Sequence, residues 1–353
     1  MNSIVAADYL IPESGDVLEV APGVLWLRMP MPFSLDHINL YLLDDIDGWV
    51  VVDCGLGNSD TQDVWERVVV EFLDGKPIKK VIATHAHIDH IGAAGWLCRR
   101  WNVPLWITAG ELDTAKEYFQ GVDGSAEIFR SEQESFLHRM GMDSKQVAGV
   151  IDTGNNIATL VQPLPNDIDE IKEGMLLEVG NRQWRVIVSQ GHSVAHACLY
   201  CEELGILISG DQVLPRISSN VSVRVSDPEG NPLLTWLHSL ERLKALPAET
   251  LVLPAHEYPF HGLRLRLSEL TDEHQEMLAR IEQACAEPQT VMQLVAVIYR
   301  RKLSLFDLLL ACGECLAHLH YLLAEQRISR ELDAEGCLRF TRPGLIEPSG
   351  MTR

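Results

Sequence analysis

Basic residues are scarce in this chain of 353 residues. Only 29 Lys and Arg stand against 50 Asp and Glu, which gives a formal net charge of −21 at pH 7. A negative field of this size repels polyanions unless a local basic patch overrides it. The composition therefore disfavours a nucleic acid as a partner, without excluding one, and favours a small-molecule substrate.

The chain also lacks the features that direct a protein out of the cell or into a membrane. Residues 1–16 carry Asp8, Glu13 and Asp16 and have no basic segment followed by an apolar one, so we expect no secretory signal. No uninterrupted apolar run is long enough to span a bilayer, and we expect no membrane partner. The eight cysteines lie mostly inside apolar runs, which indicates buried thiols in a reducing, cytoplasmic setting.

Internal repeats and low-complexity tracts are likewise missing, and a content of 46% hydrophobic and 22% charged residues is that of a globular protein. A chain of this length suits a large domain with an appendage. The pattern changes after Glu287-Pro288. We therefore expect a first domain over residues 1–275 and a helical C-terminal domain over residues 276–353.

Strand-like and helix-like segments alternate through the first domain. The apolar strands 49–53 and 79–84 are each followed by a helical pattern, and the chain has two strand-rich halves. This arrangement predicts an α/β sandwich. Between the halves, residues 111–152 are helical and polar. Such an insertion fits equally a solvated helical pair or a lid over a substrate pocket.

The C-terminal domain has the order helix, helix, hairpin. Helical patterns cover residues 290–300 and 306–325, and two short strands follow at 328–332 and 337–341. This order is typical of a winged-helix module, which often binds nucleic acid; a homodimer contact and a support for a lid are the other roles open to it. Its one basic cluster, Arg300-Arg301-Lys302, is short and favours a solvated helix end.

Five strands lead into residues that can bind a metal ion or support one. They end at Asp53, at the run His85-Ala86-His87-Ile88-Asp89-His90, at His192, at Asp211 and at His256. The carboxyl ends of neighbouring strands converge on one crevice. We therefore expect these side chains to meet in a single site.

The spacing inside the run indicates how it binds. His85 and His87 are two residues apart, so in extended backbone they point the same way and grip one metal. Asp89 and His90 follow as the chain turns into a helix and reach a second metal. A lone buried His is usually a hydrogen-bonded core residue, but three His and one Asp within six residues would cost several kcal/mol each if buried without partners. Imidazole and carboxylate ligands suit zinc, and also iron or manganese.

Residues 17–262 resemble the metallo-β-lactamase superfamily, in particular its glyoxalase II-like and endoribonuclease-like branches. The resemblance rests, in the family's order, on Asp53, on Thr84-His85-Ala86-His87-Ile88-Asp89-His90, on Gly191-His192-Ser193, on Gly210-Asp211 and on Pro254-Ala255-His256. It implies an αββα sandwich with the winged-helix appendage that some members carry. Where many members read Gly-His-Ser/Thr-Pro-Gly-His, residues 191–196 lack the Pro-Gly, which concerns the shape of the loop and not the ligand His192. Many members also have a Gly before the last His, where this chain has Ala255.

The resemblance also implies a role for each site residue. The first metal ion would be held by His85, His87 and His192, the second by Asp89, His90 and His256, and Asp211 would bridge the two. Asp53 would orient a ligand imidazole or the attacking water, and Asp89 would accept a proton or steer the nucleophile. Asp89 and Asp53 are therefore the candidate catalytic residues, and two divalent ions, most readily zinc, are the expected cofactors.

A metal pair lowers the pKa of bound water to about 7 and so supplies hydroxide at neutral pH. We expect a metal-dependent hydrolase in which residues 1–275 are the catalytic domain and the substrate is a small ester, thioester or lactone. The first alternative is an endoribonuclease-like phosphodiesterase, which the helix-helix-hairpin order favours and the acidity disfavours. The second is a non-catalytic regulatory protein that binds metal, which the complete ligand set disfavours.

Four residues are candidates for contact with the substrate: Arg216, Asn220, His196 and Tyr258. Arg216 and Asn220 follow Asp211 closely, and a guanidinium in this place could bind a carboxylate or a phosphate. An ion-paired surface Arg is slightly favoured. His196 and Tyr258 are near the ligands in sequence, but such residues more often serve packing.

Overall fold

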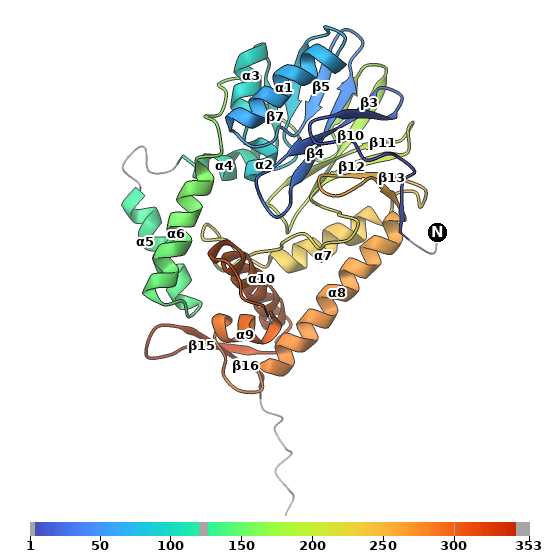
Figure 1. The fold of residues 1–353 in the computed structure, drawn as a ribbon. Helices are drawn as coiled ribbons and strands as arrows, with labels where there is room; N and C mark the ends of the chain where they lie inside the picture. Colours follow the sequence, from blue (N-terminus) through green and yellow to red (C-terminus); the bar gives the residue numbers. More distant parts are fainter. Residues whose placement is uncertain (1–3, 120–125, 300, 344–353) are drawn as a thin grey trace, which may run out of the picture. The chain divides into compact units, whose positions relative to one another are not determined.

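The computed structural model describes residues 4–119, 126–299 and 301–343 (Figure 1). The chain forms two compact units. The first unit comprises Met1–Asp123, Asn155–Ser219 and His238–Leu270, and the second comprises Gly124–Gly154, Asn220–Leu237 and Thr271–Arg353. Each unit is made of three separate stretches of the chain. The predicted domain boundary at residue 275 divides the chain in a different way, and it stays a prediction.

The first unit contains two seven-stranded sheets, which confirm the predicted α/β class. One sheet has the order β2 (Val17–Ala21), β3 (Val24–Pro30), β4 (His37–Asp44), β5 (Trp49–Val52), β6 (Ile78–Ile82), β7 (Leu105–Ile107), β8 (Ile168–Glu170). The other has the order β1 (Val5–Ala6), β14 (Phe260–His261), β13 (Leu251–Pro254), β12 (Ile206–Gly210), β11 (His196–Cys201), β10 (Arg182–Ser189), β9 (Leu176–Val179). Both sheets are mixed, with parallel pairing from β5 to β8 and between β12 and β13.

Strand β4 shows why the sequence folds into layers. Alternate side chains of a strand point to opposite faces; Leu40 and Leu42 pack with helix residues such as Trp65, whereas Tyr41 and Leu43 pack into the core between the two sheets. All but one residue of β4 is buried, which explains its nearly continuous apolar sequence. The strand therefore belongs to two cores at once.

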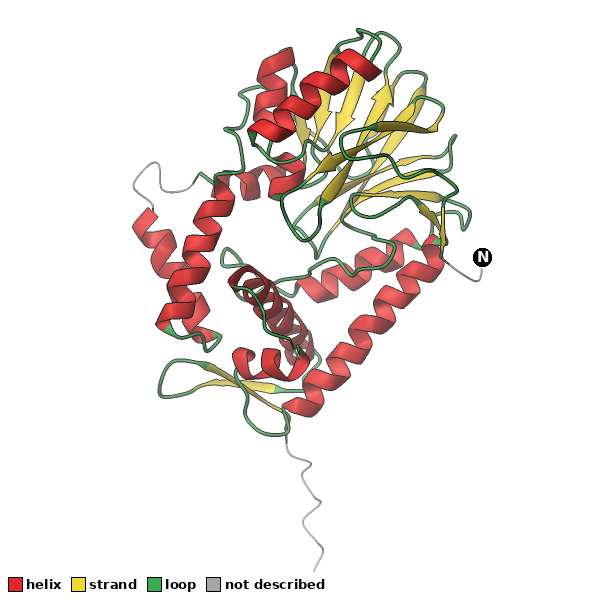
Figure 2. Cartoon of the chain, in the orientation of Figure 1, coloured by secondary structure: helices red, strands yellow, loops and turns green. Residues whose placement is uncertain are grey.

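Helices cover both outer faces of the sheet pair, as the αββα sandwich requires. Helices α1 (Ser59–Phe72) and α3 (Ala94–Trp101) lie on the first sheet, and the figures show them on its outer side (Figures 1 and 2). Helix α7 (Pro232–Leu243) contacts the end of β10, where Ser239 accepts a hydrogen bond from the Gln190 amide and Arg242 donates one to the Val188 carbonyl. Asn58 directly precedes α1, and its side chain caps the first turn by accepting a hydrogen bond from the Thr61 amide.

Two short helices follow β6 and β7. They are α2 (Ile88–Ile91), which carries the second half of the His/Asp run, and α4 (Ala109–Glu117). The long helix α8 (Leu263–Ala284) follows β14.

The predicted insertion over residues 111–152 divides between the units: residues 111–117 lie in α4 of the first unit, and the rest of its described helices lie mainly in the second unit, with the C-terminal elements. Helices α5 (Ala126–Arg139) and α6 (Ser144–Ala158) confirm the helical prediction for 126–139 and 144–152, with a turn between them. Residues 120–125 of the insertion lie outside the described residues. Helix α9 (Val291–Ile298), helix α10 (Leu305–Ala324) and the hairpin of β15 (Ser329–Leu332) and β16 (Leu338–Thr341) occur in the predicted order. The lid and the winged-helix assignment stay predictions.

The basic cluster of this unit is only partly described. Arg300 lies outside the described residues. Arg301, whose side chain is exposed, forms an ion pair of 3.2 Å with Asp307 in the first turn of α10. This pairing reduces the charge that the cluster can offer to a polyanion.

Helix α10 bears on the expectation that the chain has no membrane partner, which stays a prediction. In the described part of the chain it is the single helix long and apolar enough to cross a membrane by length and composition alone, with 20 residues and a hydropathy of 1.3. About half of this helix is buried inside the fold, and His318 and His320 are among the buried residues. A core helix passes the same test, so α10 is weak evidence for a membrane span.

Because β4 contributes to two cores, shortening one of its buried side chains should leave a strong packing defect. Replacing the fully buried Leu42 by Ala should destabilise the protein by about 2–5 kcal/mol, because the cavity adds to the lost transfer free energy. Val70→Ala on α1, where the side chain is 79% exposed, is the control and should change stability by less than about 0.5 kcal/mol. Urea unfolding measures both; equal midpoints for the two variants would contradict the described packing.

Candidate metal centre

The predicted site residues converge within the first unit. The run His85 to His90 follows β6, His192 follows β10, Asp211 follows β12 and His256 follows β13. These donors form two clusters. The first cluster consists of His85, His87, His192 and Asp211, and the second cluster of Asp89, His90 and His256. Within each group the donor atoms lie within 4.8 Å of one another.

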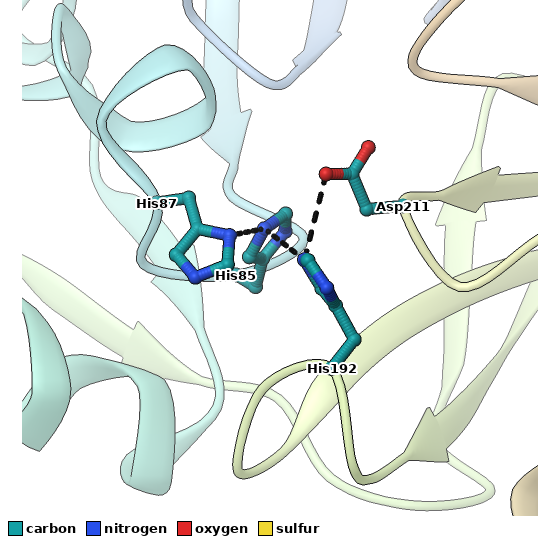
Figure 3. A group of neighbouring side chains, drawn as sticks. All are labelled: His85, His87, His192 and Asp211. Carbon is teal, nitrogen blue, oxygen red and sulfur yellow. Dashed lines mark hydrogen bonds and ion pairs between the residues drawn. The ribbon is translucent and has the colours of Figure 1, made fainter. Parts of the chain in front are cut away.

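In the first cluster, the three imidazoles face a common point beside Asp211 (Figure 3). The Nε2 atom of His85 lies 2.8 Å from Nδ1 of His87 and 3.2 Å from Nε2 of His192. The latter atom lies 3.4 Å from Oδ2 of Asp211. Ligand atoms around a tetrahedral zinc with bonds of about 2.0–2.1 Å would be roughly 3.3 Å apart, so these donors have nearly the spacing of a metal site.

The local backbone differs from the predicted one. Strand β6 ends at Ile82, and residues 84–87 form a bend and not an extended segment. The rings of His85 and His87 still meet, with centroids 4.5 Å apart, because the bend and not the alternation of a strand brings them together.

Asp211 faces both clusters. Its Oδ1 lies 3.4 Å from Nε2 of His256, and its Oδ2 lies 3.6 Å from Nε2 of His90 as well as near His192. Asp89 completes the second cluster with Oδ2 at 3.4 Å from the same nitrogen of His256. The carboxylate of Asp211 therefore has the position that a bridging ligand needs.

Unpaired buried atoms test whether a metal ion fits. Among the described residues, Nε2 of His90 and Oδ1 of Asp211 are buried and have no hydrogen-bond partner. Leaving such atoms unpaired is costly, and native proteins rarely do so. The Nδ1 atom of His90 is already bound to Asp53, so Nε2 is free to be the ligand. These residues fit a divalent cation held by nitrogen and oxygen.

Two imidazoles of the first cluster, His85 and His87, favour the neutral form. Burial lowers the pKa of His85 well below its ordinary value, and the neighbouring rings of His90 and His87 lower it further. Burial, helped by His192, lowers the pKa of His87 to about 3. A metal ion requires the neutral imidazole as its ligand, so this environment favours coordination.

In the second cluster, the imidazoles favour the protonated form instead. Burial alone would lower the pKa of His90, but Asp53, Asp89 and Asp211 together raise it well above its ordinary value. The pKa of His256 is raised in the same way, against the effect of burial, by Asp211 and Asp89. This part of the site therefore attracts positive charge, which a bound cation would supply in place of protons.

Asp53 binds the ring of His90 at Nδ1, the nitrogen that is not the candidate ligand atom. Its Oδ2 accepts hydrogen bonds from Nδ1 of His90 at 2.8 Å and from Oγ1 of Thr84 at 2.9 Å, and its Oδ1 accepts the Thr84 amide at 2.7 Å. Asp53 has a φ of 62°, a conformation that costs energy and often marks functional sites. Of the two roles implied for Asp53, this geometry matches the orientation of a ligand imidazole.

His256 is held from strand β4, which the sequence did not assign to the site. Its Nδ1 donates to the His37 carbonyl at 3.0 Å, and the ring of His37 accepts the Glu257 amide, also at 3.0 Å. Asn39, two residues further on, donates to the Pro254 carbonyl at 2.9 Å. The alternation of polar His37 and Asn39 with Ile38 and Leu40 was the available signal, because it places both polar side chains on one face.

The four predicted substrate residues occupy different surroundings. Arg216 forms a 3.0 Å ion pair with Glu257 while its side chain stays 68% exposed. His196 is buried, stacks on His85 with centroids 4.8 Å apart and accepts the Asp211 amide at 3.2 Å. Asn220 belongs to the second unit and donates to the Leu310 carbonyl, and Tyr258 packs against the core between the sheets. Their contact with a substrate stays a prediction.

An α/β sandwich with metal donors at the ends of its strands is the architecture of a class of metal-dependent hydrolases, and the family comparison agrees. Residues 34–256 match the metallo-beta-lactamase superfamily, and residues 278–343 match a metallo-beta-lactamase-like C-terminal domain. The chain belongs to the metallo-beta-lactamase superfamily and is a metallo-hydrolase of that superfamily.

Similar proteins of known sequence agree with this membership. A probable metallo-hydrolase, YqjP, of Bacillus subtilis is 24% identical over 321 residues, which cover 87% of this chain and 94% of that protein. A hydroxyacylglutathione hydrolase of Maricaulis maris is 32% identical over 111 residues, 31% of this chain and 41% of that protein.

A solved structure supports the same assignment over nearly the whole chain. A beta-lactamase domain protein from Burkholderia ambifaria is 41% identical, with a TM-score of 0.86 and coverage of 95% of this chain and 96% of that one. A metallo-beta-lactamase family protein from Thermus thermophilus is 27% identical, with a TM-score of 0.77 and coverage of 92% and 100%. Both support the fold of this chain beyond the first unit.

The position of Asp211 predicts that one substitution disturbs both clusters. Asp211→Ala should lower metal affinity by more than the roughly 10–100-fold that the loss of an outer hydrogen-bond partner costs, because a donor common to both clusters is removed. Elemental analysis after dialysis measures the bound metal. Asp272→Ala, at an exposed position of α8, is the control. Metal content equal to that of the native chain in Asp211→Ala would contradict the site.

Proposed function

We propose that this chain hydrolyses small acyl compounds, namely esters, thioesters or lactones, with two divalent cations of which zinc is the most readily accommodated. The observation that carries the proposal is the pair of buried donor clusters on either side of Asp211, at distances of 3.4 to 3.6 Å from its carboxylate oxygens. Two separate sets of nitrogen and oxygen donors with a common carboxylate match the requirements of a two-metal hydrolase.

The side chains divide the work between binding and proton handling. His85, His87 and His192 would hold one cation, and Asp89, His90 and His256 the other. When bound, the cations would supply hydroxide from water at neutral pH and polarise the carbonyl oxygen of the substrate. The carboxylate of Asp89, with 18% of its side chain exposed, is the group that can take up a proton from the attacking water.

Similarity and charge support an acyl substrate. The hydroxyacylglutathione hydrolase of Maricaulis maris, a thioesterase by name, matches part of this chain. The net charge of −21 opposes binding of a polyanion, and Arg301 is already paired with Asp307. The helix-helix-hairpin order of α9, α10 and β15–β16 is the observation that favours the alternative, a phosphodiesterase acting on RNA.

We also propose a cytoplasmic setting. Each of the eight cysteines is a free thiol, and seven of them are buried. Burial raises the pKa of several, including Cys54 and Cys315, well above the ordinary value, so these thiols are poor nucleophiles. Such thiols suit a reducing compartment.

The proposal predicts metal-dependent acyl hydrolysis. Purified native chain loaded with zinc, iron or manganese should cleave an aryl ester, a glutathione thioester or a lactone. Asp89→Asn should lower kcat by at least about 10²–10⁴-fold, because the variant loses the group that accepts the proton and weakens a ligand of the second cation as well. Initial rates are measured with bis-nitrophenyl phosphate in parallel, and Asp272→Asn is the control. Activity on the phosphate diester alone would replace the proposal with the phosphodiesterase; no metal uptake would leave a binding protein.

Metal removal should also lower thermal stability. A ligand that binds only the folded state stabilises it by about 2.7 kcal/mol at 100 times its Kd, which in a chain of this size corresponds to a Tm change of several degrees. Calorimetry before and after treatment with a chelator, with zinc added back, measures the change. An unchanged Tm in a chain whose metal has been shown to leave would contradict coupling between metal binding and folding.

A further inference from the structure

The carboxylate of Glu111, on α4, connects two loops of the metal centre. The residue has 0% of its surface exposed. Its Oε2 accepts the Ala86 amide at 2.9 Å, and its Oε1 accepts the Ala195 amide at 2.6 Å. Burying a carboxylate is expensive unless hydrogen bonds compensate it, so this group is retained with one donor on each oxygen.

Both amides belong to segments that carry ligands. Ala86 lies between His85 and His87, and Ala195 lies in the loop that begins at Gly191 and contains His192. All three imidazoles of the first cluster are thus attached to loops whose backbones meet at one carboxylate. The position of that carboxylate sets the separation of the loops.

Neighbouring contacts press the start of α4 against the second of these loops. Oγ1 of Thr108 donates to the Ala195 carbonyl at 2.8 Å. Gly110 lies so close that an added Cβ would be 3.2 Å from the side chains of Val194 and Ala195. The backbone N–H and the backbone carbonyl of Ala195 are therefore both hydrogen-bonded to side chains at the start of α4 or directly before it.

The second cluster has its own supports. Asp53 binds the ring of His90, and the His37 carbonyl binds the ring of His256. These supports come from β5 and β4. A change at Glu111 should therefore act on one cluster and spare the other.

We propose that Glu111 is a positioning residue for the first metal cluster: by accepting the Ala86 and Ala195 amides together, it holds His85, His87 and His192 at ligating distance. The inference rests on the two-metal site of the proposed function. Groups that hold metal ligands in place through hydrogen bonds change metal affinity by about 10–100-fold when they are removed.

Glu111→Gln is the sharpest test because it keeps size and burial. A glutamine has one oxygen acceptor, so its amide group must face one of the two backbone N–H donors and leave it unpaired. Asp113→Asn is the matched control on the same helix, with a side chain 76% exposed and paired to Lys116. Thr108→Val, which loses only the bond to the Ala195 carbonyl, is a milder second variant that covers the case in which Glu111→Gln does not fold.

Zinc titration of the full metal-free chain against a chromophoric chelator resolves the two affinities. Glu111→Gln should weaken one site by about 10–100-fold and leave the other within about twofold. Thr108→Val should weaken the same site by a smaller factor, and Asp113→Asn should match the native chain. The rise in Tm on adding zinc should shrink in Glu111→Gln, because that rise depends on affinity.

Each outcome bears on a different statement. A lower Tm of the metal-free chain with both affinities unchanged would make Glu111 merely structural and overturn the inference, as would equal weakening of both sites. Unchanged affinities in Thr108→Val would overturn it if Glu111→Gln does not fold. Failure of the native chain to bind zinc, iron or manganese would instead sink the two-metal function itself.

Discussion

The metal centre depends on the cost of burying the Asp211 carboxylate between imidazoles. Burial alone would raise the pKa of Asp211, but His256 and His90 hold it well below the ordinary value. Asp53 and Glu111 add two more carboxylates with at most 2% of their surface exposed. Negative charge buried at this density needs cations or many hydrogen-bond donors close by. The fold supplies the donors from backbone amides and ring nitrogens, and leaves selected atoms for metal ions.

Two sheets are needed to bring these groups together. Gly210, with φ of 50°, ends β12 so that Asp211 turns into the site, and a Cβ at Gly210 would lie 2.5 Å from Nε2 of His196. From the other sheet, β4 reaches across to the end of β13: Asn39 and Tyr41 both donate to the Pro254 carbonyl. The core between the sheets therefore fixes the distance between ligands as well as the stability of the fold.

The sequence predicted the donors better than their supports. All seven metal-ligand candidates lie in the two clusters, because strand ends and short spacings are local properties of the chain. The bonds that hold them are not local: Asn39 and Pro254 are 215 residues apart, and Glu111 and Ala195 are 84 apart. An acidic residue in the first turn of a helix is common because it complements the helix dipole, so Glu111 looked ordinary. The bend at residues 84–87 was also missed, because the spacing of His85 and His87 alone favoured an extended strand.

The loop at residues 191–196 shows how the supports explain a departure from the family pattern. Many members have proline and glycine where this chain has Val194 and Ala195. Proline fixes φ and so stiffens a loop, and its replacement by valine gives up that restraint. Here the Ala195 amide is bound by Glu111, its carbonyl by Thr108, and the Val194 carbonyl accepts a bond from Gln190. These bonds restrain the two peptide groups that follow Val194, directly after the place where the proline would act, so His192 keeps its place by contact with α4 instead of by the stiffness of its own loop.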